Sequence, residues 1–209
     1  MLLVKIFKAV SKLCLRFNFD AIAWSLRRFT IDIPPSSLVL EVGSGGNPYP
    51  RSNILLDAYE ITRERYLVPL AQDRPTVLGF GENLPFKDDS FDFVIAAHVL
   101  EHSTDPEKFL SELQRVAKAG YIEVPDAFFE RVNPYRDHRS EITVRNGKLY
   151  ILKKSGWIED ANLVELYEDR VKEHMTKELM RRRPFDFHVR FFWKGEINFE
   201  VVNNDVDAN

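Results

Sequence analysis

A glycine-rich stretch between two short apolar runs constrains this chain more than any other feature. The runs lie at residues 38–42 and 53–57, and the stretch between them, GSGGNPYPRS, contains three glycines and two prolines. Apolar runs of this length are typical of strands that are buried on both faces of a sheet. Because proline disrupts a helix and few residues remain, we expect the first crossover helix to be reduced to a turn.

Strand and helix patterns alternate through residues 36–126. The expected strands lie at 38–42, 53–57, 76–80, 91–97 and 121–124. Asp105 and Pro106 predict the start of a helix and Gly120 its end, and residues 59–68 have a weaker helical pattern. Strands that alternate with helices predict a parallel sheet with crossover connections, which places the chain in the α/β class.

The pattern changes after residue 126. An Asn-Gly pair predicts the turn of a hairpin over residues 142–151, and a Lys-Gly pair predicts a second hairpin over 188–202. Between them, residues 160–183 have the pattern of a charged helix. We therefore expect one domain, with an N-terminal helical segment at 1–35, a cofactor-binding core at 36–126 and substrate-side additions at 127–209.

The N-terminal segment is amphipathic and basic. Residues 2–17 follow a helical pattern, a second helical stretch covers 20–29, and six basic side chains stand against one acidic side chain within residues 1–30. We expect the first helix to pack as a lid over the domain, because amphipathic helices usually face a core. The alternative is a weak contact of residues 1–17 with an anionic membrane surface.

Composition narrows the class of protein and the compartment. The chain has 209 residues, 44% of them hydrophobic, which is typical of an ordinary globular domain. A single cysteine, Cys14, excludes an internal disulfide and predicts a reducing, cytoplasmic location. The net charge of −3 argues against a nucleic-acid partner. No apolar run is long enough to span a bilayer, and no pattern indicates an oligomeric state.

The glycine-rich loop indicates a nucleotide-like ligand, and its details narrow the choice. A P-loop requires a lysine that the stretch lacks. A dinucleotide fingerprint requires a third glycine where Pro48 stands, and an acidic residue further along than Asp57. S-adenosylmethionine has no pyrophosphate. It needs the close backbone approach that glycines allow and a carboxylate for its ribose hydroxyls, so we favour it as the cofactor.

The segment VLEVGSGG resembles the first motif of the class I methyltransferases, with Asn47 where a third glycine is usual. Three further segments resemble the same family, namely GENLPFKDDSFDFV, AHVLEH and ELQRVAKAG. The resemblance covers residues 36–126 and points to the small-molecule subgroup that carries HVLEH. It implies a Rossmann-like sheet, S-adenosylmethionine as cofactor, and in-line methyl transfer to an oxygen or nitrogen atom of a small-molecule acceptor.

The resemblance also implies a set of site residues. The expected cofactor-binding residues are Glu41, Gly43, Ser44, Gly45, Gly46, Asn47, Asp57, Glu82 and Asn83. His98 and His102 follow a buried strand and are the candidate general bases, with Glu101 and His138 as the next candidates. Of the cofactor residues, Asp57 is expected to meet the ribose.

The chemistry requires little of the protein beyond alignment, because a sulfonium is already a strong electrophile. The sequence has no metal-ligand cluster with convincing spacing, so we expect no metal. Two rival interpretations remain. The chain could be a non-catalytic module or scaffold that binds S-adenosylmethionine, or a nicotinamide-dependent reductase.

Overall fold

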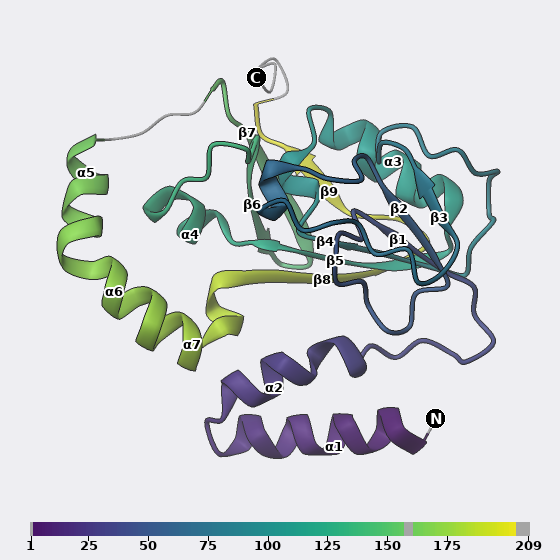
Figure 1. Ribbon diagram of the computed structural model, residues 1–209, viewed down its shortest axis with the longest axis horizontal. Helices are drawn as coiled ribbons and strands as arrows, with labels where there is room; N and C mark the ends of the chain where they lie inside the picture. Colours follow the sequence, from purple (N-terminus) through teal and green to yellow (C-terminus); the bar gives the residue numbers. More distant parts are fainter. Residues whose placement is uncertain (1, 157–160, 204–209) are drawn as a thin grey trace.

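Two β-sheets form the centre of the fold in a computed structural model of the chain, which describes residues 2–156 and 161–203 (Figure 1). The larger sheet has the order β3-β2-β1-β4-β5-β8, and the smaller has the order β6-β7-β9. The strands are β1 (Val39–Val42), β2 (Ile54–Asp57), β3 (Thr76–Leu78), β4 (Phe93–Ala97), β5 (Ala119–Pro125), β6 (Ser140–Arg145), β7 (Lys148–Lys153), β8 (His188–Lys194) and β9 (Phe199–Val201).

Helices and short helical turns surround these sheets. The helices are α1 (Leu2–Arg16), α2 (Asp20–Leu26), α3 (Pro106–Val116), α4 (Ala127–Val132), α5 (Ala161–Leu166), α6 (Lys172–His174) and α7 (Met180–Arg182). The turns are η1 (Arg27–Phe29), η2 (Arg63–Arg65), η3 (Leu100–His102), η4 (Tyr167–Val171), η5 (Met175–Leu179) and η6 (Pro184–Phe187). Elements α5 to α7 follow one another in a single curved helical path (Figure 1).

The predicted Rossmann-like α/β sheet is confirmed. Strands β1 to β5 pair in parallel, so their carboxyl ends meet at one edge of the sheet. As expected, no helix is present between β1 and β2 in this fully described part of the chain. Asp105 caps α3 by accepting a hydrogen bond from the Lys108 N–H at 3.0 Å, and Pro106 occupies the first turn.

The two faces of the larger sheet are covered differently. One face packs against α3, whose apolar stripe is buried, and against the smaller sheet in a continuous core. The other face carries a smaller cluster formed by Ile31, Ile33 and Tyr49 over Ile95 and Tyr121. The N-terminal segment is therefore tied to the sheet through the residues that follow η1.

The first predicted hairpin is confirmed and the second is wrong. Strands β6 and β7 pair around Asn146 and Gly147, which both have positive φ. Strand β8 instead pairs antiparallel with β5 at the edge of the larger sheet, and β9 pairs with β7 in the smaller one. In β8, the alternating side chains Val189, Phe191 and Trp193 are buried. The two strands of the predicted hairpin are therefore present, but they pair in different sheets.

Two predicted helix features are also wrong. Residues 59–68 form only the short turn η2, flanked by Tyr66 and Leu67 in the left-handed region. Helix α3 ends at Val116, and Gly120 lies within β5. A Cβ at Gly120 would stand 2.6 Å from the Trp193 indole nitrogen, so this glycine permits close packing of β8 rather than a helix end. The predicted helix at 160–183 is present from Ala161 to Arg182, and residue 160 lies outside the described residues.

Candidate functional site

A cavity of 810 Å³ opens at the carboxyl ends of β1, β2 and β4. Open α/β sheets bind ligands at this edge, and a volume of this size holds a drug-sized molecule. Nine of the eleven residues expected in the site line the cavity, namely Gly43, Ser44, Gly45, Gly46, Asn47, Asp57, Glu82, His98 and His102. The other two, Glu41 and Asn83, do not line it.

The glycine-rich loop has a backbone that side chains would disrupt. Gly43 and Gly45 have φ of +70° and +60°, the left-handed region that favours glycine. A Cβ at Gly43 would also stand 2.5 Å from the Val99 side chain. The Ser44 hydroxyl is buried and has no hydrogen-bond partner within the described residues. The loop therefore allows a ligand in the cavity to approach its backbone closely, and it contains one polar atom without a hydrogen bond.

Asp57 at the end of β2 is held by the protein itself. It accepts hydrogen bonds from the Gly45 N–H at 2.9 Å and the Tyr59 N–H at 3.1 Å, and its other close contact is an ion pair with Arg65 at 2.8 Å. Arg65 belongs to η2, the turn that replaces the expected helix. Asp57 thus fixes the glycine-rich loop and the η2 segment against each other at the cavity wall.

Glu41 forms hydrogen bonds with residues of the glycine-rich stretch and does not line the cavity. Its carboxylate accepts hydrogen bonds from the Tyr49 N–H at 2.8 Å and the Ser52 hydroxyl at 2.5 Å. Burial raises the pKa of Glu41 to about 7, although these two hydrogen bonds act in the opposite direction. Asn83 is exposed, whereas its neighbour Glu82 accepts a hydrogen bond from Ser103 at 2.5 Å.

His98 sits between two buried carboxylates. Its Nε2 is 3.2 Å from Glu123 and its Nδ1 is 3.6 Å from Glu101. Burial acts to lower the pKa of His98, but the two carboxylates outweigh it and raise that pKa to about 9. His98 has φ of +55°, an uncommon backbone conformation for a residue other than glycine. Both ring nitrogens therefore face protein carboxylates.

Glu123 is a buried partner of His98 that the sequence patterns did not single out. It is fully buried in β5 and is bound by Arg27, by His98 and by the Tyr121 hydroxyl. Burial alone would raise the pKa of Glu123, but the hydrogen bonds from His98 and Arg27 lower it. The signal was present, since an acidic residue in the otherwise apolar run YIEV requires a buried partner.

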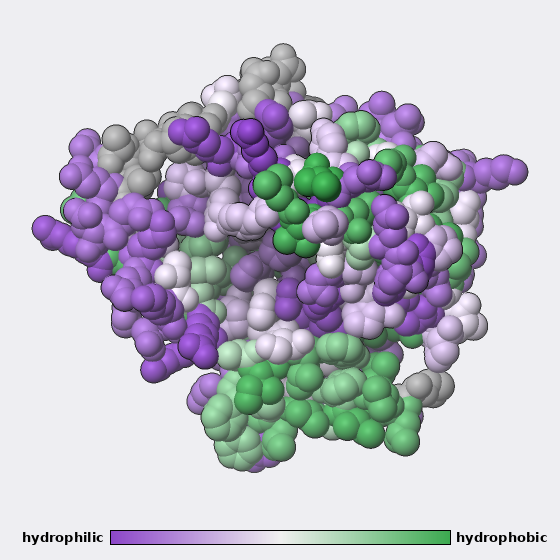
Figure 2. All heavy atoms as spheres, in the orientation of Figure 1, coloured by the Kyte–Doolittle hydropathy of each residue, from purple (hydrophilic) through white to green (hydrophobic). Residues whose placement is uncertain are grey.

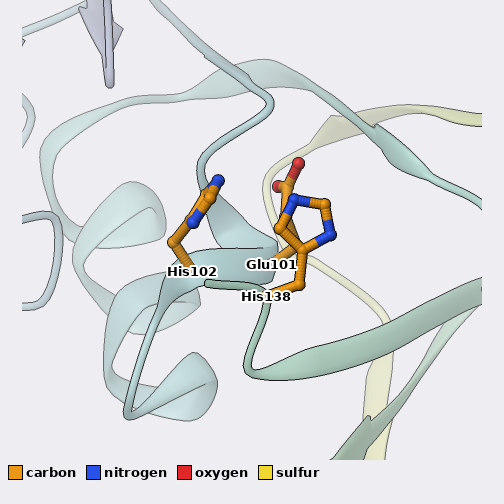
Figure 3. Close-up of side chains that lie close together, drawn as sticks. All are labelled: Glu101, His102 and His138. Atoms are coloured by element: carbon orange, nitrogen blue, oxygen red, sulfur yellow. The ribbon is translucent and has the colours of Figure 1, made fainter. Parts of the chain in front are cut away.

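Two more histidines line the same cavity, and we call the part of its wall that they form with Glu101 the histidine wall. His102 and His138 have ring centroids 4.8 Å apart in an edge-to-face arrangement, and Tyr135 stacks on His138 at 4.8 Å. The Arg139 N–H donates to the Glu101 carbonyl at 2.6 Å, which holds the segment after α4 against η3. Figure 3 shows His102, His138 and Glu101 together at this wall.

The expected packing of the first helix as a lid on the domain is wrong. Within the described residues, none of residues 2–35 lines the cavity, and α1 buries none of its side chains. Helix α1 packs along α2 and η1, below the sheets in Figure 1. No helix among the described residues is long and apolar enough to cross a membrane.

Comparison with known proteins finds matches to methyltransferases. The methyltransferase domain family matches residues 40–122. The chain is 27% identical to the sterol 24-C-methyltransferase of Schizosaccharomyces pombe, over 78% of this chain and 50% of that one. It is 29% identical to the ubiquinone biosynthesis O-methyltransferase of Hahella chejuensis, over 57% of this chain and 52% of that one. The chain thus spans about half the length of these relatives.

A solved structure supports the same fold over nearly the whole chain. It is a complex of the Trm112 methyltransferase activator of Haloferax volcanii with a methyltransferase, and the match has a TM-score of 0.51 at 15% identity. It covers 95% of this chain and 98% of that one. Together with the parallel sheet and the glycine-rich loop, these matches support a class I S-adenosylmethionine-dependent methyltransferase.

Proposed function

We propose that this protein transfers a methyl group from S-adenosylmethionine to an oxygen or nitrogen atom of a small-molecule acceptor. The observation that carries the proposal is the single cavity shared by the glycine-rich loop and the histidine wall. Asp57 and the loop line this cavity together with His102 and His138. A cofactor and an acceptor can therefore meet inside one cavity.

The residues present fit S-adenosylmethionine. Gly43 and Gly45 permit close backbone approach, and the unsatisfied Ser44 hydroxyl lies at the same place. Asp57 and Glu82 provide carboxylates for ribose hydroxyls and for a cationic ligand. When bound, the cofactor supplies an electrophilic methyl group.

The protein's own contribution would be alignment and removal of a proton. Holding two reactants in line can supply roughly 7–11 kcal/mol of the barrier reduction. Both nitrogens of His98 face carboxylates, so we place His98 in a positioning role and place His102 at the acceptor. A polar group at that position can assist an oxygen or nitrogen nucleophile by roughly 10²–10⁴-fold.

Turnover tests this proposal directly. The protein is incubated with S-adenosylmethionine and separate acceptor classes, namely a sterol, a quinol, small amines, small carboxylic acids and tRNA, and S-adenosylhomocysteine is measured. We expect product with one small-molecule class, and a large loss of turnover in His102→Ala. Cofactor binding without turnover on any class would favour the non-catalytic module, and methylation of tRNA alone would contradict the small-molecule acceptor.

Cofactor choice is tested separately by calorimetry. We expect S-adenosylhomocysteine to bind more tightly than NAD, because the loop lacks the third glycine and the helix that bind a pyrophosphate. Asp57→Ala should weaken binding by about 1.5–3 kcal/mol. Since Asp57 also pairs with Arg65 of η2, Arg65→Ala is the control for loss of that ion pair. Tighter binding of NAD would instead support the reductase.

We also propose that α1 and α2 rest on an anionic membrane surface. Figure 2 shows apolar side chains gathered over these two helices. Exposed apolar residues of this segment include Leu2, Leu3, Ile6, Val10, Leu13, Phe17, Phe19 and Ile22, and we call these eight the N-terminal patch. Leu2 and Leu13 are 74% and 56% exposed.

Charge identifies the occupant of the N-terminal patch. Lys5, Lys12 and Arg16 border the apolar face of α1 and form no ion pair with any described residue, whereas Lys8 pairs with Asp32 at 2.7 Å. An apolar face bordered by free basic side chains matches the boundary between acyl chains and anionic headgroups. A second copy of this basic N-terminal segment would bring like charges together, so the lipid surface is the better partner.

A further inference from the structure

The histidine wall contains a cluster with the composition of a transition-metal site. Glu101, His102 and His138 each offer one ligand atom, and these atoms lie within 4.8 Å of one another. Figure 3 shows the Glu101 carboxylate beside the His138 ring, with the His102 ring opposite. Glu101 and His102 belong to η3 and His138 to the segment after α4, so the cluster is formed by two separate parts of the chain.

The burial of the Glu101 carboxylate requires an explanation. Its side chain is buried, with the whole residue only 2% exposed, and neither carboxylate oxygen has a hydrogen-bond partner within the described residues. The nearest cation is His98 at 3.6 Å, which is too long for a hydrogen bond. A buried carboxylate that accepts no hydrogen bond is costly even beside His98, and coordination to a cation compensates for it.

The two histidines are already oriented as metal ligands. His102 Nδ1 lies 3.0 Å from the Asp137 carbonyl, and His138 Nδ1 lies 2.6 Å from a Glu130 carboxylate oxygen. A carbonyl and a carboxylate accept hydrogen bonds, so each Nδ1 carries a hydrogen, and the tautomer with this hydrogen has its lone pair on Nε2. Metal-binding histidines commonly donate their second nitrogen to such an acceptor.

Glu130 completes the support behind His138. It is 2% exposed in α4, pairs with Lys154, and also accepts the Tyr135 N–H at 3.1 Å. These contacts hold its carboxylate in place and leave one oxygen for the His138 ring. The arrangement of carboxylate, imidazole and open ring nitrogen is the one that fixes a histidine for coordination.

We propose that Glu101, His102 and His138 bind a divalent first-row transition-metal ion such as Zn²⁺ at the acceptor end of the cavity. Two imidazoles and one carboxylate suit these metals, whereas Mg²⁺ prefers oxygen ligands. Metal–ligand bonds of about 2.0–2.2 Å require the three ligand atoms to move toward one another by roughly an ångström. Three protein ligands leave one coordination position open for an oxygen or nitrogen atom of the methyl acceptor. Binding of the acceptor to the metal rests on the proposed methyl transfer, whereas binding of the metal to the protein does not.

Metal binding is measured first, without turnover. The full chain is treated with EDTA and titrated with ZnCl₂ in a calorimeter, and X-ray absorption at the zinc edge is recorded on the complex. We expect one Zn²⁺ per chain, two imidazoles in the first shell, and no comparable binding of Mg²⁺. Glu130→Gln should weaken Zn²⁺ binding by about 10–100-fold through His138, although Glu130 does not touch the ion.

Matched variants separate this site from surface binding. We expect His138→Ala and Glu101→Gln to abolish stoichiometric binding, and His174→Ala and Cys14→Ser to leave it unchanged, because His174 is exposed on α6 and Cys14 lies in α1. Calorimetry with S-adenosylhomocysteine shows whether each variant keeps its cofactor site. Absence of stoichiometric Zn²⁺ binding by the folded wild type, or binding that survives both ligand substitutions, would overturn the metal site and leave the methyl-transfer proposal intact.

Discussion

Arg27 and Glu123 form a buried ion pair that links the N-terminal segment to strand β5 of the larger sheet. The guanidinium donates to both carboxylate oxygens at 2.8–3.1 Å, although the two residues are 96 positions apart. Arg27 also stacks on Trp24 in α2 at 3.8 Å, and Glu123 reaches His98 at the cavity. One carboxylate thus holds both the N-terminal helices and a histidine of the site.

Loss of Arg27 should destabilise the whole domain. In Arg27→Met, Glu123 loses its main cation in a buried position, so we expect the free energy of unfolding to fall by about 3 kcal/mol. Urea denaturation measures the change. Arg27→Met combined with Glu123→Gln should recover much of the loss, because the uncompensated charge is then removed. A loss no larger than that of Lys177→Met, which breaks an exposed pair, would contradict this account.

Glu41 should make stability depend on pH. Its native pKa of about 7 is above the ordinary value of 4.5, so the native state binds more protons than the unfolded state between these two values. Stability of the wild type relative to Glu41→Gln should therefore be highest below pH 4.5, fall as the pH rises to about 7, and then level off. The full change is about 3 kcal/mol. Urea denaturation of both proteins from pH 5 to 8 measures it, and a constant difference would show that the Glu41 pKa is not raised.

Gly43 and Gly147 provide a matched pair of substitutions. Both have φ near +70°, but a Cβ at Gly43 would meet Val99 at 2.5 Å whereas a Cβ at Gly147 would meet nothing within 4 Å. Gly147→Ala should cost only the backbone strain of about 1–3 kcal/mol and leave cofactor affinity unchanged. Gly43→Ala should cost more stability and weaken binding of S-adenosylhomocysteine by at least tenfold. Equal effects of the two variants on binding would exclude a special role for Gly43.

The N-terminal patch should bind anionic vesicles. Flotation with phosphatidylglycerol-containing vesicles should recover the wild type at low salt, with less recovered at high salt because the basic residues are screened. Leu13→Glu should reduce binding without lowering the thermal midpoint, since Leu13 is already exposed. Val202→Glu is the control, because it changes an apolar residue with 57% exposure outside the patch. A dimer that Leu13→Glu dissociates, with no vesicle binding in the wild type, would assign the patch to a second copy.

The local sequence determined the core of the fold. Short apolar runs bounded by glycine, proline and Asp57 predicted strands β1 to β5, and Asp105-Pro106 predicted the start of α3. These features depend on neighbouring residues, on capping hydrogen bonds and on the exclusion of proline from helices, so a single sequence contains them. The glycine-rich loop could be recognised for the same reason, because positive φ is a local property of the backbone.

Tertiary structure decided which partners the other elements and side chains found. The alternation in β8 and β9 predicted strands but could not show that they belong to different sheets, since a period of two is the same for any partner strand. His138 is 36 positions from His102, and only the packing of the segment after α4 against η3 brings it beside Glu101. Burial of a carboxylate, and the pKa or ligand that results from it, depends on contacts between distant residues, and no local pattern records them.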